Sequence, residues 1–134
     1  MEIQRDRHAT HLLHARLVFI TKYRYKVLAK KHLEYLEKIF KETMEEMGGR
    51  LIEFNGEADH VHLLIQYPPK YSISKIVNNL KGRSSRLLRR DMPDIKEKYW
   101  GKARLWSRSY FAGSVGGAPL EIVKQYIQNQ ATPE

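Results

Sequence analysis

The stretch "ADHVHLLIQY", residues 58–67, places two histidines, His60 and His62, at the head of an apolar run. Valine, isoleucine and tyrosine are common in strands, and alternate side chains of a strand point to opposite faces. Residues 60–67 therefore predict a strand that presents both imidazoles side by side on one face. The other elements of the fold are predicted from their position relative to this strand.

The sequence on either side predicts the partners of this strand. Residues 50–56, "RLIEFNG", form a second β-prone run, and the short spacer "EAD" suits a hairpin between the two. Residues 12–21 alternate between Ala15, Leu17 and Phe19 on one face and a mixed set on the other, which predicts another strand.

Helices are predicted where apolar residues recur with a period near 3.6. Residues 29–47 show this pattern and stop at a Gly-Gly pair, and a second helix begins at Ser72 or Ser74 and extends to Leu88. The remaining segments are a loop with one helical turn at 91–103, a fourth strand at 104–112, a glycine-rich break at 113–117 and a last helix at 118–130.

The element order is strand, helix, strand, strand, helix, strand, helix. It predicts a single domain, residues 1–134, of the α+β class, with a ferredoxin-like antiparallel sheet and helices on one face. The C-terminal helix is an addition to that arrangement. At 134 residues the chain can bury one core but not two.

Composition restricts the partner. The chain has 24 Lys and Arg against 15 Asp and Glu, a net charge of +9, which favours a polyanion such as nucleic acid. It has no cysteine, so a disulfide framework and a thiolate zinc site are excluded. No apolar run approaches the roughly 20 residues that cross a bilayer, and we expect a soluble, cytoplasmic protein without a membrane partner.

The histidine pair suggests a metal site. Imidazole is a common metal ligand, and two imidazoles on one rigid strand can hold a divalent ion while leaving coordination positions open. An H-x-H pair can also arise by chance. Three other histidines, His8, His11 and His14, have no strand period that links them, and His32 lies among lysines of a helix and is expected to be solvated.

Tyr126 and Gln130 lie four residues apart in the last predicted helix and therefore share a face. One interpretation is a core tyrosine with its hydroxyl at the surface. The other is a nucleophile. Because an unperturbed phenol titrates near pH 10, it needs a target that a metal has polarised, and the amide oxygen of Gln130 could be a neutral third ligand.

A basic surface follows the second helix and the segment after it. Cations there alternate with Tyr and Trp, a combination that suits single-stranded bases stacking beside neutralised phosphates. A merely solvated charged face is the alternative. The candidate DNA-binding residues are Lys75, Lys81, Arg83, Arg86, Arg89, Arg90, Arg104 and Arg108.

Four motifs in this order, "TKYRYKVL", "DHVHLLI", "LWSRSYFAGSVGG" and "IVKQYIQNQ", strongly resemble the single-tyrosine HUH transposases of insertion sequences, the TnpA-like family. The resemblance extends over residues 12–130. It implies that Tyr126 is the catalytic nucleophile and that His60, His62 and Gln130 hold Mg²⁺ or Mn²⁺.

The resemblance also implies a reaction and an assembly. We expect cleavage and rejoining of single-stranded DNA at element ends that fold into hairpins, through a 5′-phosphotyrosine intermediate. We further expect a homodimer in which the tyrosine helix of one subunit completes the histidine site of the other.

Other functions remain open at this stage. A domesticated HUH nuclease acting on repeated hairpins would share the chemistry, and a non-enzymatic RNA-recognition-type module would share the element order and the preference for single strands. The RNA-recognition module leaves the histidine pair unexplained. Two-histidine phosphoesterases need two H-x-Ser/Thr motifs, which this chain does not provide.

Overall fold

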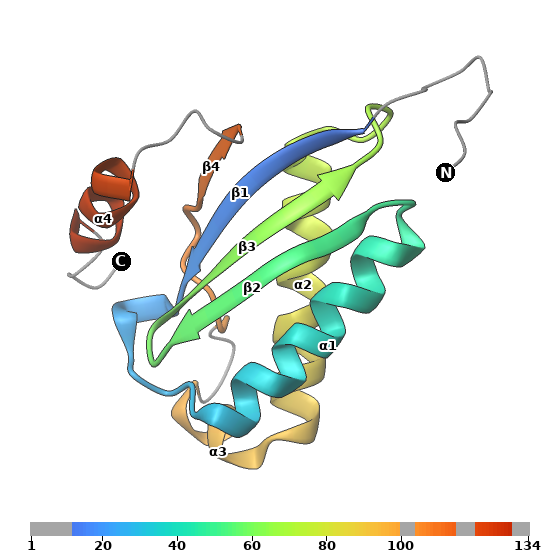
Figure 1. The fold of residues 1–134 in the computed structure, drawn as a ribbon. Coiled ribbons are helices and arrows are strands. Elements are labelled where there is room, and N and C mark those ends of the chain that lie inside the picture. Colours follow the sequence, from blue (N-terminus) through green and yellow to red (C-terminus); the bar gives the residue numbers. More distant parts are fainter. Residues whose placement is uncertain (1–11, 100–103, 115–119, 130–134) are drawn as a thin grey trace.

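The computed structural model describes residues 12–99, 104–114 and 120–129 (Figure 1). The elements follow the predicted order, with two short helical segments between the longer ones. In chain order they are β1 (Leu13–Ile20), the 3-10 turn η1 (Lys22–Arg24), α1 (Lys30–Glu46), β2 (Arg50–Glu57), β3 (His60–Tyr67), α2 (Ile73–Asp91), α3 (Pro93–Lys98), β4 (Phe111–Ser114) and α4 (Leu120–Asn129).

The strands form one antiparallel sheet in the order β2-β3-β1-β4. The predicted hairpin joins β2 to β3 through the two-residue turn Ala58–Asp59. Figure 1 shows α2 behind the sheet and α1 beside it, close to β2. The predicted α+β class and the ferredoxin-like arrangement are confirmed.

The helix-covered face of the sheet carries the core. Leu17 and Phe19 of β1 and Leu63 of β3 are fully buried there, as their alternating positions predict. The ring of Phe19 lies 5.9 Å from that of Phe40 in α1 and 5.8 Å from that of Trp106, measured between centroids. Because burial of a side chain of this size contributes about 1.5–3 kcal/mol, this core fixes which face of β1 and β3 points outward.

His32 is buried, and the expectation that it is solvated was wrong. Its Nδ1 accepts a hydrogen bond of 2.8 Å from the backbone N–H of Ala29, just before α1. Its Nε2 lies 2.9 Å from Oδ2 of Asp94 in α3. The imidazole therefore ties the start of α1 to α3, a contact between distant segments that the neighbouring lysines did not indicate.

The fourth strand differs from its prediction. β4 spans Phe111–Ser114, and the segment before it contributes only an isolated bridge between Thr21 and Trp106. Trp106 is buried and donates from Nε1 to Ser84 Oγ of α2 at 2.9 Å. This contact draws the segment toward α2, so regular pairing with β1 begins only at Phe111.

Helix α4 lies beside β4, at the edge of the sheet (Figure 1). Tyr126 and Ile127 pack against Val18 and Ile20 of β1, which point to the face that α1 and α2 leave uncovered. The prediction of helices on one face therefore holds for α1 and α2, whereas α4 contacts the other face. None of the helices in the described segments has an apolar stretch of the length needed to cross a membrane.

Candidate active site

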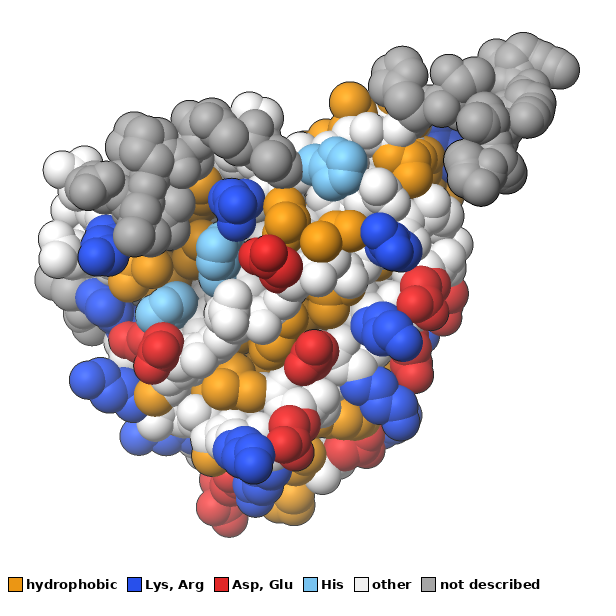
Figure 2. Space-filling view, in the orientation of Figure 1, with side chains coloured by type: hydrophobic (Ala, Val, Ile, Leu, Met, Phe, Trp, Pro, Cys, Tyr) orange, Lys and Arg blue, Asp and Glu red, His pale blue; other side chains and the backbone are white. Residues whose placement is uncertain are grey.

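The histidine pair lies on the uncovered face of the sheet, which we call the open face. In the register of β1 and β3, His62 is paired with Val18 and His60 with Ile20. Directly paired residues of antiparallel strands point to the same side, so both imidazoles lie beside the residues that contact α4. Figure 2 shows histidine side chains on this face among hydrophobic and charged groups.

His62 has the features of a metal ligand. Its Nε2 is buried and has no hydrogen-bond partner among the described residues, which is uncommon for a buried polar atom. Burial, and then the positive charge of Arg16, lower the pKa of His62 below its ordinary value, although Glu53 acts in the opposite direction. A lower pKa keeps the imidazole neutral at pH 7, and the neutral form has the lone pair that binds metal.

His60 is oriented by a carboxylate. Its Nδ1 lies 2.9 Å from Oδ1 of Asp59, and the Nε of Arg24 donates to Oδ2 of Asp59 at 2.8 Å. Burial raises the pKa of Asp59, but the hydrogen bonds from His60 and Arg24 outweigh it and bring the pKa below the usual value. Asp59 is thus ionised at neutral pH and can only accept, so Nδ1 of His60 donates; in the neutral imidazole this leaves the lone pair on Nε2.

Tyr126 reaches the open face from α4. Its ring centroid is 5.8 Å from that of Phe111, and its hydroxyl lies 3.1 Å from Oγ of Ser109. Phe111 is paired with Val18, which is also paired with His62 on its other side. The fold therefore brings the predicted nucleophile and the predicted metal ligands to one face of the sheet. In the single chain, α4 packs on its own sheet.

The donor set fits a divalent ion that still needs further ligands. His60 and His62 each offer an imidazole nitrogen, and in its neutral form such a nitrogen suits Mn²⁺ and other borderline divalent ions. Within the described segments, no group of three His, Cys, Asp or Glu side chains could hold a metal ion. Gln130, predicted as the third ligand, lies outside the described residues, as do His8 and His11.

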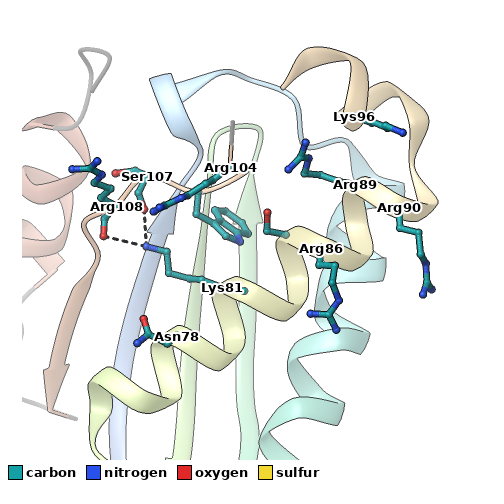
Figure 3. A pocket seen from close by; sticks show the side chains of 12 residues that line it. Asn78, Lys81, Arg86, Arg89, Arg90, Lys96, Arg104, Ser107 and Arg108 are labelled. Atoms are coloured by element: carbon teal, nitrogen blue, oxygen red, sulfur yellow. Dashed lines mark hydrogen bonds between the residues drawn. The ribbon is translucent and has the colours of Figure 1, made fainter. Parts of the chain in front are cut away.

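A basic cavity lies between α2, α3 and the segment before β4 (Figure 3). Its volume is about 710 Å³, and its described lining includes seven Lys or Arg side chains and no Asp or Glu. Phosphate binding requires positive charge. One of these cations, Arg90, is paired with Asp91, with 2.7 Å between its Nε and Oδ1 of the carboxylate, so its charge is partly neutralised. The cationic lining residues are Lys81, Arg86, Arg89, Arg90, Lys96, Arg104 and Arg108.

The eight predicted DNA-binding residues do not all line this cavity. Six of them do, whereas Lys75 and Arg83 do not. Arg83 forms a bidentate ion pair with Glu46 of α1, at 2.6 and 3.0 Å, which holds the pKa of Glu46 below its usual value. Helical spacing could not reveal this pairing, because Glu46 comes from a different helix.

Lys81 has a specific structural role within the cavity. Its Nζ donates to the backbone carbonyls of Ser107, Arg108 and Ser109, at 2.6, 3.3 and 3.3 Å. Figure 3 shows it pointing from α2 toward the facing segment. Part of its charge is therefore used to hold this segment rather than to attract phosphate.

Some residues at these sites were missed in the sequence. Asp59 and Arg24 were not singled out, although both fall inside motifs that resemble the HUH transposases. Ser109 was missed because its contact with Tyr126 joins a loop to a helix. Only Asp59 could have been identified from the sequence. It immediately precedes the histidine pair, and a carboxylate at the start of a strand can reach the first imidazole.

Comparisons with known proteins relate the chain to transposases. The sequence model of the family described as Transposase IS200 like matches residues 9–130. The chain is 31% identical to the ISDra2 transposase TnpA of Deinococcus radiodurans over 134 residues, covering 100% of this chain and 95% of that relative. It is 33% identical to the transposase for insertion sequence element IS200 of Salmonella typhimurium over 114 residues, covering 85% and 74%.

Solved structures resemble the chain as well. A crystal structure of a candidate transposase from Deinococcus radiodurans R1 superposes with a TM-score of 0.86 and 31% identity, covering 96% of this chain and 98% of that one. A REP-associated tyrosine transposase bound to a REP hairpin superposes with a TM-score of 0.55 and 9% identity, covering 95% and 68%. At 9% identity the second likeness concerns the fold alone.

Proposed function

This chain belongs to the family of IS200-like transposases, and we propose that it cleaves and rejoins single-stranded DNA at the ends of an insertion sequence. The observation that carries the proposal is that Tyr126 and the His60/His62 pair share the open face of the sheet. A nucleophile and metal-binding nitrogens on one rigid surface are the two elements that phosphoryl transfer to a phenol requires.

In the first step, the phenol oxygen of Tyr126 attacks the scissile phosphorus. An O–P bond forms to the tyrosine, and the bond from phosphorus to the 3′ oxygen breaks. One strand leaves with a 3′-hydroxyl, and the protein keeps the 5′-phosphate as phosphotyrosine. In the second step, a 3′-hydroxyl attacks this phosphorus, re-forms a phosphodiester and releases Tyr126. The covalent link conserves the energy of the bond, so no external source is required.

His60 and His62, with Gln130 as the proposed third ligand, would hold Mg²⁺ or Mn²⁺. When bound, such an ion polarises the scissile phosphate. Mg²⁺ prefers oxygen ligands, so two imidazoles suit Mn²⁺ at least as well. Ser109 contributes by holding the phenol of Tyr126 through its Oγ before the substrate arrives.

The proposal is tested by incubating the protein with end-labelled single-stranded DNA from the ends of its own element, together with Mn²⁺. We expect a labelled adduct that survives denaturing electrophoresis and that does not form when EDTA is present from the start of the incubation. The same sequence as a fully paired duplex is the control and should give no adduct. If no adduct forms with any strand from either end, the proposed reaction is wrong.

The basic cavity is the proposed contact with the DNA backbone. Arg86 lines it from α2 and Arg104 from the segment before β4, and neither forms an ion pair with another described residue. For single strands, each neutralised phosphate contributes about 0.7 to the slope of log K against log salt. Phosphate contacts in this cavity would therefore produce a steep loss of affinity as salt increases.

The Arg86→Ala, Arg104→Ala double variant should lower this salt slope by about 1.4, since two phosphate contacts are removed. Fluorescence anisotropy with a labelled hairpin over a salt series measures it. Arg83→Ala is the matched control: it removes a cation from the same helix, but one that is paired with Glu46 outside the cavity. Equal slopes for the wild type and the double variant would exclude the cavity from DNA binding.

We also propose a homodimer in which α4 of each subunit serves the histidine pair of the other. Among the described side chains, Tyr126 and Ile127 hold α4 on its own sheet by packing against Val18, Ile20 and Phe111. The same apolar contacts are available on the identical open face of a second copy. A two-fold assembly would then contain two equivalent sites.

Mixing two inactive variants tests whether α4 of one subunit serves the histidine pair of the other. Tyr126→Phe subunits combined with His62→Ala subunits should regain cleavage, because a mixed dimer contains one site with an intact pair from one subunit and an intact tyrosine from the other. Each variant alone is the control. If mixed dimers form and bind DNA but do not cleave, Tyr126 acts within its own subunit.

A further inference from the structure

The motif "TKYRYKVL", residues 21–28, wraps around the turn between β2 and β3. The backbone N–H of Thr21 donates to the carbonyl of Asp59 at 3.0 Å, and that of Leu28 donates to the carbonyl of Ala58 at 2.9 Å. Thr21 also directs its hydroxyl to the Asp59 carbonyl at 3.3 Å. Both ends of the motif are thus fixed to the turn that precedes the histidine pair.

The middle of the motif has an unusual backbone. Tyr23 and Arg24 have φ angles of 61° and 55°, in the left-handed region that residues other than glycine seldom adopt. Such a conformation persists only where surrounding contacts hold it. The hydroxyl of Tyr99 donates to the Lys22 carbonyl at 2.9 Å, and the Tyr23 ring lies 5.3 Å from that of Tyr25.

This backbone directs Arg24 at Asp59. The two oxygens of Asp59 have separate partners: Oδ2 accepts from Nε of Arg24 at 2.8 Å, and Oδ1 accepts from Nδ1 of His60 at 2.9 Å. The Asp59 side chain is only 8% exposed. A carboxylate buried in this way is held in one position. Its hydrogen bond with Nδ1 therefore also fixes the orientation of the His60 ring.

We propose that Asp59, held by Arg24, is a positioning residue that keeps the proton of His60 on Nδ1 and so leaves Nε2 available to a metal ion. Metal-binding histidines commonly donate their other ring nitrogen to a carboxylate, which fixes the tautomer and the ring orientation. This inference rests on the proposed function, because it assigns His60 to the metal site. The motif at 21–28 would then contribute to metal binding, because it supplies the Arg24 that holds Asp59.

A purely structural ion pair between Arg24 and Asp59 is the alternative. It would close the turn but would not affect which nitrogen of His60 carries the proton. The two cases therefore differ in a property of His60 itself. Long-range ¹H–¹⁵N NMR spectra of the metal-free wild type report this property directly.

We expect those spectra to show that the neutral form of His60 carries its proton on Nδ1. In Asp59→Asn, the population protonated on Nε2 should increase, because the amide no longer requires a donor from the imidazole. Binding of Mn²⁺, followed by the EPR signal of the free ion, should weaken about 10–100-fold in this variant. Affinity for a DNA hairpin without metal should stay within about twofold.

The matched control is Asp94→Asn. Asp94 is also hydrogen-bonded to a histidine, His32, at 2.9 Å. This pair, however, lies at α3 and not on the open face. This variant should bind Mn²⁺ as the wild type does. Weakening that is equal in both variants would indicate a general loss of stability and would overturn the proposal.

The NMR measurement keeps the test decisive even if Asp59→Asn does not fold, because a wild-type His60 whose neutral form carries its proton on Nε2 overturns the inference without any variant. If the wild type binds Mn²⁺ and Asp59→Asn binds it equally well, the inference fails while the metal site stands. If the wild type does not bind Mn²⁺ and the His60, His62 double alanine variant still cleaves DNA, the proposed metal site fails as well.

Discussion

The Tyr126→Phe variant is expected to form no covalent adduct and to cleave single-stranded DNA more slowly by about 10⁴-fold or more, as for removal of a covalent nucleophile. The substitution removes only the hydroxyl. The ring contact with Phe111 and the packing on Val18 and Ile20 remain, so the position of α4 should not change. The free energy of unfolding should fall by no more than about 0.5–1.5 kcal/mol, the net value of one hydrogen bond.

Denaturing electrophoresis of labelled DNA measures the adduct, and product formation over time measures cleavage. Ser109→Ala is the matched control, because it removes the same 3.1 Å contact from the other side and keeps the phenol. It should cleave within about tenfold of the wild type. An adduct of normal yield in Tyr126→Phe would show that another residue is the nucleophile, and peptide mapping would identify it.

Replacing both His60 and His62 with alanine should abolish cleavage and leave affinity for the DNA hairpin within about twofold. The imidazoles lie on the open face, whereas the basic cavity is lined by α2, α3 and the segment before β4. The loss should not reflect unfolding. Nε2 of His62 makes no hydrogen bond with the described residues that could be lost, and Asp59, which loses its contact with His60, keeps its hydrogen bond from Arg24. Cleavage assays, anisotropy and circular dichroism measure the three properties.

The control for this double variant is His14→Ala. His14 is on the same face, in β1, and its Nε2 lies 3.2 Å from Nε2 of Gln66, at the other end of β3 from the pair. It should cleave at the wild-type rate. If the double variant also cleaves at that rate, His60 and His62 are not metal ligands and the proposed mechanism is wrong.

The faces of the sheet could be predicted because they depend on strand alternation alone. Leu17 and Phe19 had to be buried once α1 and α2 covered one side, and His60 and His62 then had to point away from them. The hairpin was equally predictable, since its two runs are separated by a short polar spacer. In each case the deciding interactions are close in sequence.

Interactions between distant segments could not be predicted in this way. Trp106 has a β-prone pattern around it, yet its hydrogen bond to Ser84 draws it to α2 and shifts the fourth strand to Phe111–Ser114. Arg83 looks like its neighbours on α2, but Glu46 of another helix neutralises it. Helical spacing identifies the members of a basic face without identifying which of them already have a carboxylate partner.

The contact of Lys81 with three consecutive carbonyls has a consequence for engineering. It holds residues 107–109. Ser107 and Arg108 line the basic cavity, and Ser109 contacts the hydroxyl of Tyr126. Under the proposed function, the residues that contact DNA and the residue that supports the nucleophile are therefore not separable modules. A redesign that reshapes the cavity for a different hairpin would shift the support of the tyrosine, so selection for new specificity has to include strand joining, not binding alone.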